Sequence, residues 1–282
     1  MEKSVESYNR IIPTGFLTAY PRTLTDIPLS DQIFRELVSI KESHGEEFGE
    51  DIVSDRLALG VEARYKLVNR ILDENQSFQI VELAAGLSPR GALLTENPNL
   101  KYSELDLPEM ADLKKEILAR VKPNMSDNLR IFGGNALSED DINQAVLGFD
   151  KSKPVTVISE GILGYFSFDE KRKLARNIFE VINKNNGVWI STDAPGPSAP
   201  LWAGRSGKLV SDKNFSEDMF NNRQHFKQFF EEIGYTVYFR DLTEVLPELV
   251  SVERLGISGK YVVDNLNKYS SVAVMQTRTI TV

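Results

Sequence analysis

The sequence predicts an α/β protein built on a doubly wound, mostly parallel sheet. Short apolar segments that fit buried strands alternate along the chain with longer segments whose apolar residues recur at helical spacing. The stretch 78–91, FQIVELAAGLSPRG, joins one segment of each kind through a turn of small residues. A parallel strand that feeds a helix in this way leaves backbone N–H groups at the carboxyl edge of the sheet, where nucleotide-like ligands bind.

The 282 residues are expected to form a single domain. Residues 1–56 mix turn formers with one amphipathic helix that begins at Ser30, and they are expected to form an N-terminal flank or lid. Residues 194–225 are rich in Pro and Gly and form either a substrate-facing insertion or a surface loop. The segment 242–269 shows no clear pattern and is left unassigned.

Between these segments the elements follow one another in regular order. A helix over 57–74 leads into the first strand, and further helices are predicted from Pro108, after Ser138, over 168–183 and over 216–233. The remaining strands are predicted at 100–107, 129–132, 154–159, 187–192, 235–241 and 271–282. The last two are expected to form a hairpin-like pair at one edge.

Composition excludes several classes of protein and site. The chain has no cysteine, so disulfides, thiolate metal sites and a cysteine nucleophile are ruled out, and no metal site is expected. A net charge of −8 argues against a nucleic-acid surface. The sequence shows neither a signal peptide nor an apolar run long enough to span a membrane, so we expect a cytoplasmic protein without a membrane partner.

Small, acidic or amide residues follow four of the predicted strands. The first end is Ala84-Ala85-Gly86, where glycine permits a close backbone approach. Asp106 lies 20 residues further on, the spacing at which a carboxylate accepts hydrogen bonds from a ribose diol, and Glu104 on the same strand is a weaker candidate. Asn135 and Glu160 follow two more strands. Because parallel strands share one carboxyl edge, these residues are expected to lie together, although each alone is also compatible with an ordinary turn or solvated end.

The turn favours one kind of cofactor over another. A dinucleotide needs a G-x-G-x-x-G cradle for its pyrophosphate, and only Gly86 of that pattern is present. S-adenosyl-L-methionine carries adenine, ribose and a zwitterionic tail but no phosphate. One glycine and several carboxylates suit it better.

Three motifs together resemble the leucine carboxyl methyltransferase family. They are VELAAGLSPRG at 81–91, YSELDLPE at 102–109 and ISEGILGYF at 158–166. That family includes protein phosphatase methyltransferases and bacterial O-methyltransferases of the tetracenomycin type. The resemblance covers about residues 57–183 and implies a Rossmann-like, class I methyltransferase fold with seven strands, the last of them antiparallel.

The resemblance also implies roles for individual residues. It assigns Arg64 to the cofactor carboxylate, Gly86 to the methionine part and Asp106 to the ribose, and it includes Glu82 and Ala84 among the cofactor-binding residues. Asn135 and Ala136 are assigned to the adenine, Glu160 to the amino-acid end, and Arg22 to a further basic contact. The chain departs from the family's pattern at Ser88-Pro89, where Asp-Thr is common, and at Asn135, where Asp is common.

The function expected from this resemblance is methyl transfer to a carboxylate or hydroxyl oxygen of a small, polyketide-like acceptor. Alternatives are methylation of a protein C-terminal carboxylate and a non-catalytic module that binds the cofactor. A hydroxyl acceptor would need a base, for which His44 and His225 are the neutral-pH candidates. The candidates for lining the acceptor pocket are Arg90, Tyr165, Trp202 and Arg205, whose cations suit an anionic substrate, and each of the four is equally compatible with a structural role. The oligomeric state is left open, with a homodimer as one alternative.

Overall fold

A seven-stranded sheet forms the centre of the computed structural model, which describes residues 18–43, 57–184, 186–196 and 218–277. The strand order is β3-β2-β1-β4-β5-β7-β6. Strand β7 runs antiparallel to both of its neighbours, and the pairs among β1 to β5 are parallel. This topology confirms the class I methyltransferase fold and the antiparallel pair at one end, where β6 forms the edge. The strands are β1 (Gln79–Leu83), β2 (Lys101–Asp106), β3 (Leu129–Gly133), β4 (Thr156–Ser159), β5 (Val188–Pro195), β6 (Tyr235–Arg240) and β7 (Ser270–Thr277).

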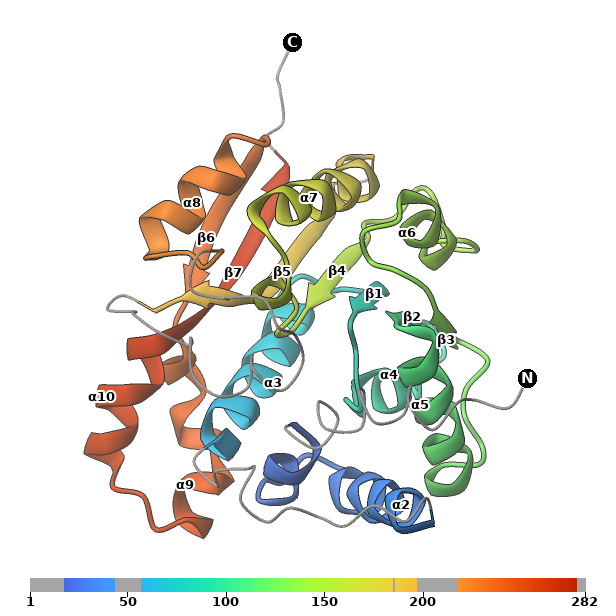
Figure 1. The fold of residues 1–282 in the computed structure, drawn as a ribbon, viewed down its shortest axis with the longest axis vertical. Helices are drawn as coiled ribbons and strands as arrows, with labels where there is room; N and C mark the ends of the chain where they lie inside the picture. Colours follow the sequence, from blue (N-terminus) through green and yellow to red (C-terminus); the bar gives the residue numbers. More distant parts are fainter. Residues whose placement is uncertain (1–17, 44–56, 185, 197–217, 278–282) are drawn as a thin grey trace.

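Helices cover both faces of this sheet (Figure 1). One face carries α6 (Glu139–Ala145), α7 (Phe168–Asn183) and α8 (Arg223–Glu231), and the other carries α3 (Leu57–Glu74), α5 (Pro108–Val121) and α10 (Gly259–Tyr269). Successive residues of β1 pack against opposite faces, because Ile80 joins the apolar cluster of α3 whereas Val81 and Leu83 join that of α7. A strand buried on both faces is continuously apolar, which is why the period-2 alternation of a half-buried strand is missing from this part of the sequence.

Two segments differ from the prediction. The helix expected over 216–233 begins only at Arg223, since the side chain of Asn222 caps it by accepting a hydrogen bond from the His225 backbone N at 2.8 Å. The unassigned segment 242–269 forms the 3-10 helix η4 (Leu242–Glu248), then α9 (Val250–Arg254) and α10. Val245 of η4, Leu249 between η4 and α9, and Val262 of α10 belong to the apolar cluster that contains the buried face of α3, with α10 packed on η4 and β7.

The N-terminal flank packs over the start of the fold. Residues 18–23 are helical, and α2 (Ser30–Ser43) lies against α5. Its buried Leu37 shares an apolar cluster with Leu87 of the turn after β1 and with Leu113 of α5. The described part of the flank therefore reaches the turn predicted to hold the cofactor. The predicted roles of 1–56 as a lid and of 194–225 as an insertion stay predictions, because residues 1–17, 44–56 and 197–217 lie outside the described residues.

Within the described ranges, none of the helices has the length and apolar character needed to cross a membrane.

Candidate functional site

The turn after β1 has the backbone geometry that the sequence predicted. Ala84 and Gly86 both have positive φ values, of 52° and 50°. A hydrogen bond from the Ala84 N to the Leu105 carbonyl oxygen, 2.8 Å long, ties the turn to the end of β2. A Cβ atom added to Gly86 would meet nothing within 4 Å, so the space on that side is open. The turn can therefore admit a ligand against its backbone, and Ala84 carries strain of about 1–2 kcal/mol for it.

Asp106 ends β2 directly beside this turn. One of its carboxylate oxygens accepts a hydrogen bond from the Gly86 N at 2.7 Å, and the other accepts one from the Leu107 N at 2.8 Å. Burial raises the pKa of Asp106, and these two N–H groups oppose the rise. Each oxygen keeps a lone pair that can accept a further hydrogen bond. The structure thus brings together the glycine and the carboxylate that the 20-residue spacing paired.

The weaker candidate, Glu104, lies away from this edge. It is fully buried beneath α5, and the Lys114 Nζ lies 2.5 Å from its carboxylate. Burial raises the pKa of Glu104 to about 7, against the opposing charge of Lys114. A Cβ atom on Gly91 would lie only 2.4 Å from the Glu104 Oε1, so that glycine serves the packing of this pair.

The third strand end lies beside Asp106. Gly134, just past β3, donates a hydrogen bond from its N to the Asp106 carbonyl oxygen at 2.8 Å. The next residue, Asn135, is exposed, and its side-chain oxygen accepts a 2.9 Å hydrogen bond from the Leu137 N. Ala136 is buried. The position suits the predicted adenine contact, which stays a prediction.

Arg90 does not line an acceptor pocket, which corrects the expectation from the sequence. Its side chain is 0% exposed, and its guanidinium forms ion pairs with Glu82 and Glu160. The Nε of Arg90 donates a 2.9 Å hydrogen bond to the Asn69 Oδ1, and its Cζ lies 4.6 Å from the centre of the Tyr65 ring. The first residue of the short helix α4 (Arg90–Leu94) therefore points beneath the turn, where it neutralises two carboxylates.

Glu82 is the second correction. The carboxylate is buried, one oxygen accepts from Arg90, and the other accepts from the Tyr102 hydroxyl at 2.8 Å. Because both oxygens are engaged below the sheet edge, Glu82 supports the site and does not contact a cofactor there. Glu160 differs, since 18% of its side chain remains exposed beside the same arginine. Burial raises the pKa of Glu160, but the charges of Arg90, Arg64 and Arg22 outweigh it and hold the pKa below its usual value.

Two further arginines carry donors without partners. The side chain of Arg22 is 8% exposed, and among the described residues its Nε and Nη1 have no hydrogen-bond acceptor. The Nε of Arg64 is also buried, and it too has no hydrogen-bond acceptor among the described residues. Burial lowers the pKa of Arg22, while the nearby charge of Glu160 opposes the shift. Unpaired buried donors are costly, and an anionic group such as the carboxylate of an amino acid would satisfy them.

Asp193, near the end of β5, is a site residue that sequence reasoning missed. Its carboxylate accepts hydrogen bonds from the Ile162 N at 3.3 Å and from the Ser191 Oγ at 3.4 Å. Burial raises the pKa of Asp193 to about 6, with the charge of Arg64 opposing and that of Glu160 adding to the rise. It therefore holds the loop that follows Glu160. The signal was present, because Asp193 directly follows the predicted strand 187–192 as Glu160 follows 154–159, but the prediction considered only four other strand ends; in the structure β5 continues past Asp193 to Pro195.

Tyr165 lies on the 3-10 helix η2 (Leu163–Tyr165), half-exposed at the rim of this loop. Burial of its hydroxyl and the charge of Asp193 raise the pKa of Tyr165. This position is compatible with an acceptor contact, which stays a prediction. Trp202, Arg205 and His44 lie outside the described residues.

His225 packs within an aromatic cluster at the start of α7 and α8. Its ring centre lies 5.4 Å from those of Phe168 and of Phe220, and its Nδ1 accepts a 3.4 Å hydrogen bond from the Asn221 N. These surroundings favour a packing role over that of a base.

Comparison with known sequences gives consistent matches. The profile of the family described as leucine carboxyl methyltransferase matches residues 30–179. A protein of Mycolicibacterium smegmatis, named as an S-adenosyl-L-methionine-dependent methyltransferase, is 30% identical over 208 residues, which cover 72% of this chain and 69% of the relative. A Mycobacterium tuberculosis protein named in the same way is 28% identical over 174 residues, 60% of this chain and 54% of that relative. The chain therefore spans about half the length of the second relative.

Solved structures agree on the fold. The methyltransferase domain of the bacterial protein CtHen1-C superposes with a TM-score of 0.51 at 14% identity, covering 77% of this chain and 98% of that domain. The magnesium protoporphyrin IX methyltransferase of Synechocystis, solved with bound S-adenosylhomocysteine, superposes with a TM-score of 0.50 at 10% identity, covering 89% and 96%. At these identities the likeness shows the class I methyltransferase fold.

Proposed function

Because the chain belongs to the leucine carboxyl methyltransferase family and is an S-adenosyl-L-methionine-dependent methyltransferase, we propose that it methylates an oxygen of a small-molecule acceptor. The acceptor oxygen belongs to a carboxylate or a hydroxyl group, with the carboxylate favoured. The bound cofactor supplies an electrophilic methyl group on its sulfonium.

One observation carries the assignment of the cofactor-binding residues. The guanidinium of Arg22 is buried, has unpartnered donors in the described structure, and interacts electrostatically with Glu160 at the carboxyl edge of the sheet. An amino-acid tail satisfies both groups, since its carboxylate accepts from Arg22 and its ammonium group donates to Glu160. Arg64 adds a second cation on the carboxylate side.

The turn and its neighbour hold the rest of the cofactor in this proposal. Gly86 leaves open space for the thioether region, and Asp106 offers lone pairs to the ribose hydroxyls. Asn135 and Ala136 follow the adjacent strand, at the place for adenine. The chain's contribution to catalysis is then alignment of the acceptor and exclusion of water, which supplies several kcal/mol in well-oriented reactions.

The acceptor preference rests on the nature of the available bases. A carboxylate is ionised near neutral pH and needs no base, whereas a hydroxyl group needs one within hydrogen-bond reach. His225, the one histidine in the described part of the chain, packs among phenylalanines and accepts a backbone hydrogen bond. Asp193 is engaged with the Ile162 backbone. These contacts support an acceptor that is already a nucleophile.

The family's name supports a second candidate, methylation of the C-terminal carboxylate of a protein. The chemistry at the acceptor oxygen is the same, and only the size of the acceptor differs. A third alternative, a module that binds the cofactor without turnover, predicts binding and no transfer to any acceptor.

Transfer of labelled methyl groups separates these readings. The purified chain would be incubated with methyl-labelled cofactor and with three panels: small carboxylic acids, phenols, and peptides that end in a free leucine carboxylate. A labelled product that mild base hydrolyses is an ester, and the panel that yields it identifies the acceptor class. A base-stable product from phenols alone would overturn the carboxylate preference. Cofactor binding by calorimetry without any transfer would favour the non-catalytic module.

A further inference from the structure

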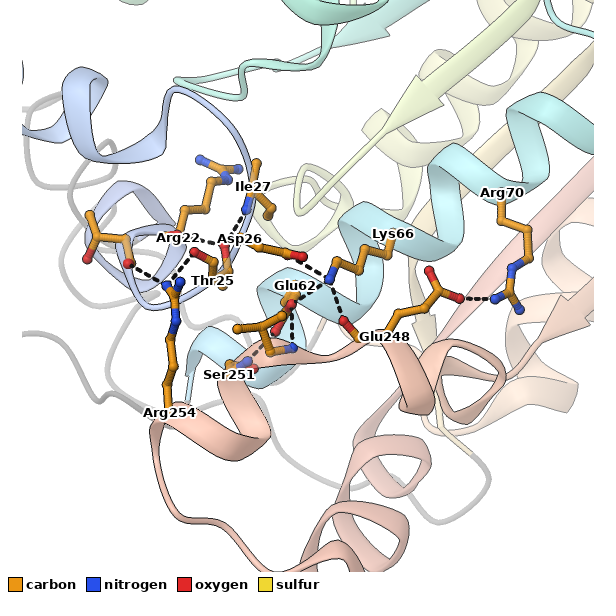
Figure 2. Close-up of polar contacts among 12 residues, drawn as sticks. Arg22, Thr25, Asp26, Ile27, Glu62, Lys66, Arg70, Glu248, Ser251 and Arg254 are labelled. Atoms are coloured by element: carbon orange, nitrogen blue, oxygen red, sulfur yellow. Dashed lines mark hydrogen bonds and ion pairs between the residues drawn. The ribbon is translucent and has the colours of Figure 1, made fainter.

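The N-terminal segment that carries Arg22 is fastened to the helices below it by a set of charged contacts (Figure 2). The segment lies beside α3 and α9, and the side chain of Arg22 points away from the fastening contacts. Its backbone carbonyl oxygen accepts hydrogen bonds from the Thr25 N at 3.1 Å and from the Thr25 Oγ1 at 2.7 Å. Arg22 and Thr25 thus form one rigid turn, so any group that holds Thr25 also fixes the backbone of Arg22.

The first fastening contact is the ion pair between Asp26 and Lys66. The Lys66 Nζ on α3 lies 2.6 Å from the Asp26 Oδ1 and 2.8 Å from the Glu62 Oε1, and it donates to the Glu248 carbonyl oxygen at 2.5 Å. The buried carboxylate of Glu62 is anchored in turn by the backbone N–H groups of residues 250 and 251. Partial burial of Asp26 is outweighed by Lys66, which holds the pKa of Asp26 below its usual value. Glu62 and the Glu248 carbonyl oxygen therefore hold the Lys66 ammonium group in place, where it pairs with Asp26 of the N-terminal segment.

The second fastening contact comes from α9. The Nη1 of Arg254 donates to the Thr25 carbonyl oxygen at 2.6 Å and lies 3.5 Å from that of Thr23. We refer to the Asp26–Lys66 ion pair and these Arg254 contacts together as the N-terminal latch. The latch joins three parts of the chain that are far apart in sequence, namely residues 23–26, Lys66 and Arg254.

The latch opposes the cost of burying Arg22. A guanidinium with unpartnered donors in a buried site would gain hydrogen bonds to water by turning outward. The short segment that carries Arg22 lies at the edge of the fold, where movement away from the helices would allow this. Lys66 and Arg254 act on the same short segment and hold it down. The site is thereby kept ready before a ligand arrives, which reduces the ordering cost of binding.

We propose that Asp26 and Arg254 are positioning residues that hold Arg22 inside the site, so that it is ready to bind the carboxylate of the cofactor's amino-acid tail. Neither residue contacts the ligand. The inference rests on the proposed cofactor-binding roles of Arg22 and Glu160. It assigns a ligand-binding purpose to contacts that would otherwise be ordinary surface ion pairs.

Two ligands differ at the group that matters for the test. S-adenosylhomocysteine carries the carboxylate, whereas 5′-methylthioadenosine has the same adenine, ribose and sulfur without the amino-acid tail. Calorimetry on Asp26→Ala and on Arg254→Ala should show affinity for S-adenosylhomocysteine reduced about fivefold by each, the size of an exposed ion pair or hydrogen bond. Affinity for 5′-methylthioadenosine should not change. In an Arg22→Ala background, Asp26→Ala should have no further effect on either ligand.

A control variant lies one turn further along the same helix. Arg70 forms an ion pair with Glu248 and donates to the Glu244 carbonyl oxygen at 2.8 Å, so both of these partners lie in η4 and not in the N-terminal segment (Figure 2). Arg70→Ala should leave both affinities unchanged. Equal losses for both ligands in the latch variants, losses that persist without Arg22, or no loss at all would each overturn the proposal.

Trypsin supplies a readout that needs no ligand. The Arg22–Thr23 bond is protected in the folded chain because Arg22 is buried. Asp26→Ala and Arg254→Ala should increase the rate of cleavage there several-fold, whereas Arg70→Ala should not. If the wild-type chain bound no S-adenosylhomocysteine, the proposed function would fail, while this assay would still report whether the latch holds Arg22. Unchanged cleavage rates in both latch variants would contradict the positioning role directly.

Discussion

Replacing Arg90 with leucine should destabilise the fold more than any surface arginine replacement. The side chain is fully buried and joins Glu82 to Glu160, so Arg90→Leu removes the ion-pair partner of two carboxylates, of which Glu160 keeps only the more distant charges of Arg64 and Arg22. Removing one partner of a buried ion pair costs about 3–5 kcal/mol. For a chain of this size, that corresponds to a fall of about 10 °C in the melting temperature. Thermal and urea unfolding at pH 7 would measure both quantities.

Arg120 provides the matched control. It also forms two ion pairs, with Glu36 at 3.2 Å and with Glu116 at 2.7 Å, but its side chain is 49% exposed. Arg120→Leu should therefore cost less than about 1 kcal/mol. The double variant Arg90→Leu with Glu82→Gln should recover part of the loss, because one of the stranded charges is gone.

The pH dependence of the Arg90→Leu loss gives a second check. In the wild type the pKa of Glu160 lies below its usual 4.5, although burial alone would raise it, because three arginines favour the charged form. The ion pair thus contributes stability above about pH 4.5 that is lost as the pH falls through the lower folded pKa. Without Arg90 the pKa of Glu160 rises, so the carboxylate takes up a proton more readily. The destabilisation should shrink as the pH falls from 7 towards 5. A loss no larger than that of Arg120→Leu, or one independent of pH, would refute this reasoning.

Three further predictions concern the edge of the sheet. Asp106→Ala should weaken S-adenosylhomocysteine binding about 10- to 100-fold by calorimetry, while Asp112→Ala, on an exposed part of α5, should not. Gly86→Val should cost about 1–2 kcal/mol of stability and abolish measurable binding, whereas Gly148→Ala, also at positive φ with open space around it, should cost stability alone. Asp193→Asn should gain stability relative to the wild type as the pH rises from 4 to 7, by about 2 kcal/mol. Burial raises the pKa of Asp193 to about 6 from 3.8, so ionising this carboxylate costs the folded wild type stability as the pH rises through that interval. Melting temperatures that change with pH by the same amount in the wild type and in the variant would contradict this prediction.

Local pattern was enough to predict most of the fold. The strand at β1, its turn and the helix over 57–74 follow from apolar spacing and from one glycine, and the structure reproduces them closely. The pairing of Gly86 with Asp106 was predictable because parallel strands align their ends, so a 20-residue separation in sequence becomes a hydrogen bond of 2.7 Å. Such features depend on residues near one another in the chain or on a single rule of sheet geometry.

Other features depend on tertiary packing and left no local signal. Arg90 follows the turn as a pocket-lining arginine would, and nothing nearby in sequence shows that Glu160, 70 residues away, draws it beneath the sheet edge. The short helices η4, with Pro247, and α9 contain only a few apolar residues each, so packing on α3 rather than their own periodicity determines their form. Asn222 is different, because an asparagine that caps the helix three residues ahead is a local signal, which the prediction of a helix over 216–233 overlooked.

Charge balance explains why a zwitterion suits this edge of the sheet. The residues that interact electrostatically there carry equal numbers of opposite charges: Arg22, Arg64 and Arg90 against Glu82, Glu160 and Asp193. Arg90 and Glu82 are hydrogen-bonded to each other and to their neighbours. They therefore contribute to the electrostatic potential of the site but offer no free group to a ligand. The groups left open in the described part of the chain are the guanidinium groups of Arg22 and Arg64, which have unpartnered donors, and the partly exposed carboxylate of Glu160. A ligand with one ammonium and one carboxylate group satisfies both without adding net charge, whereas a phosphate would leave Glu160 facing further negative charge. The same charge balance separates Arg90, which supports the site from below, from Arg22, for which we propose a ligand-binding role.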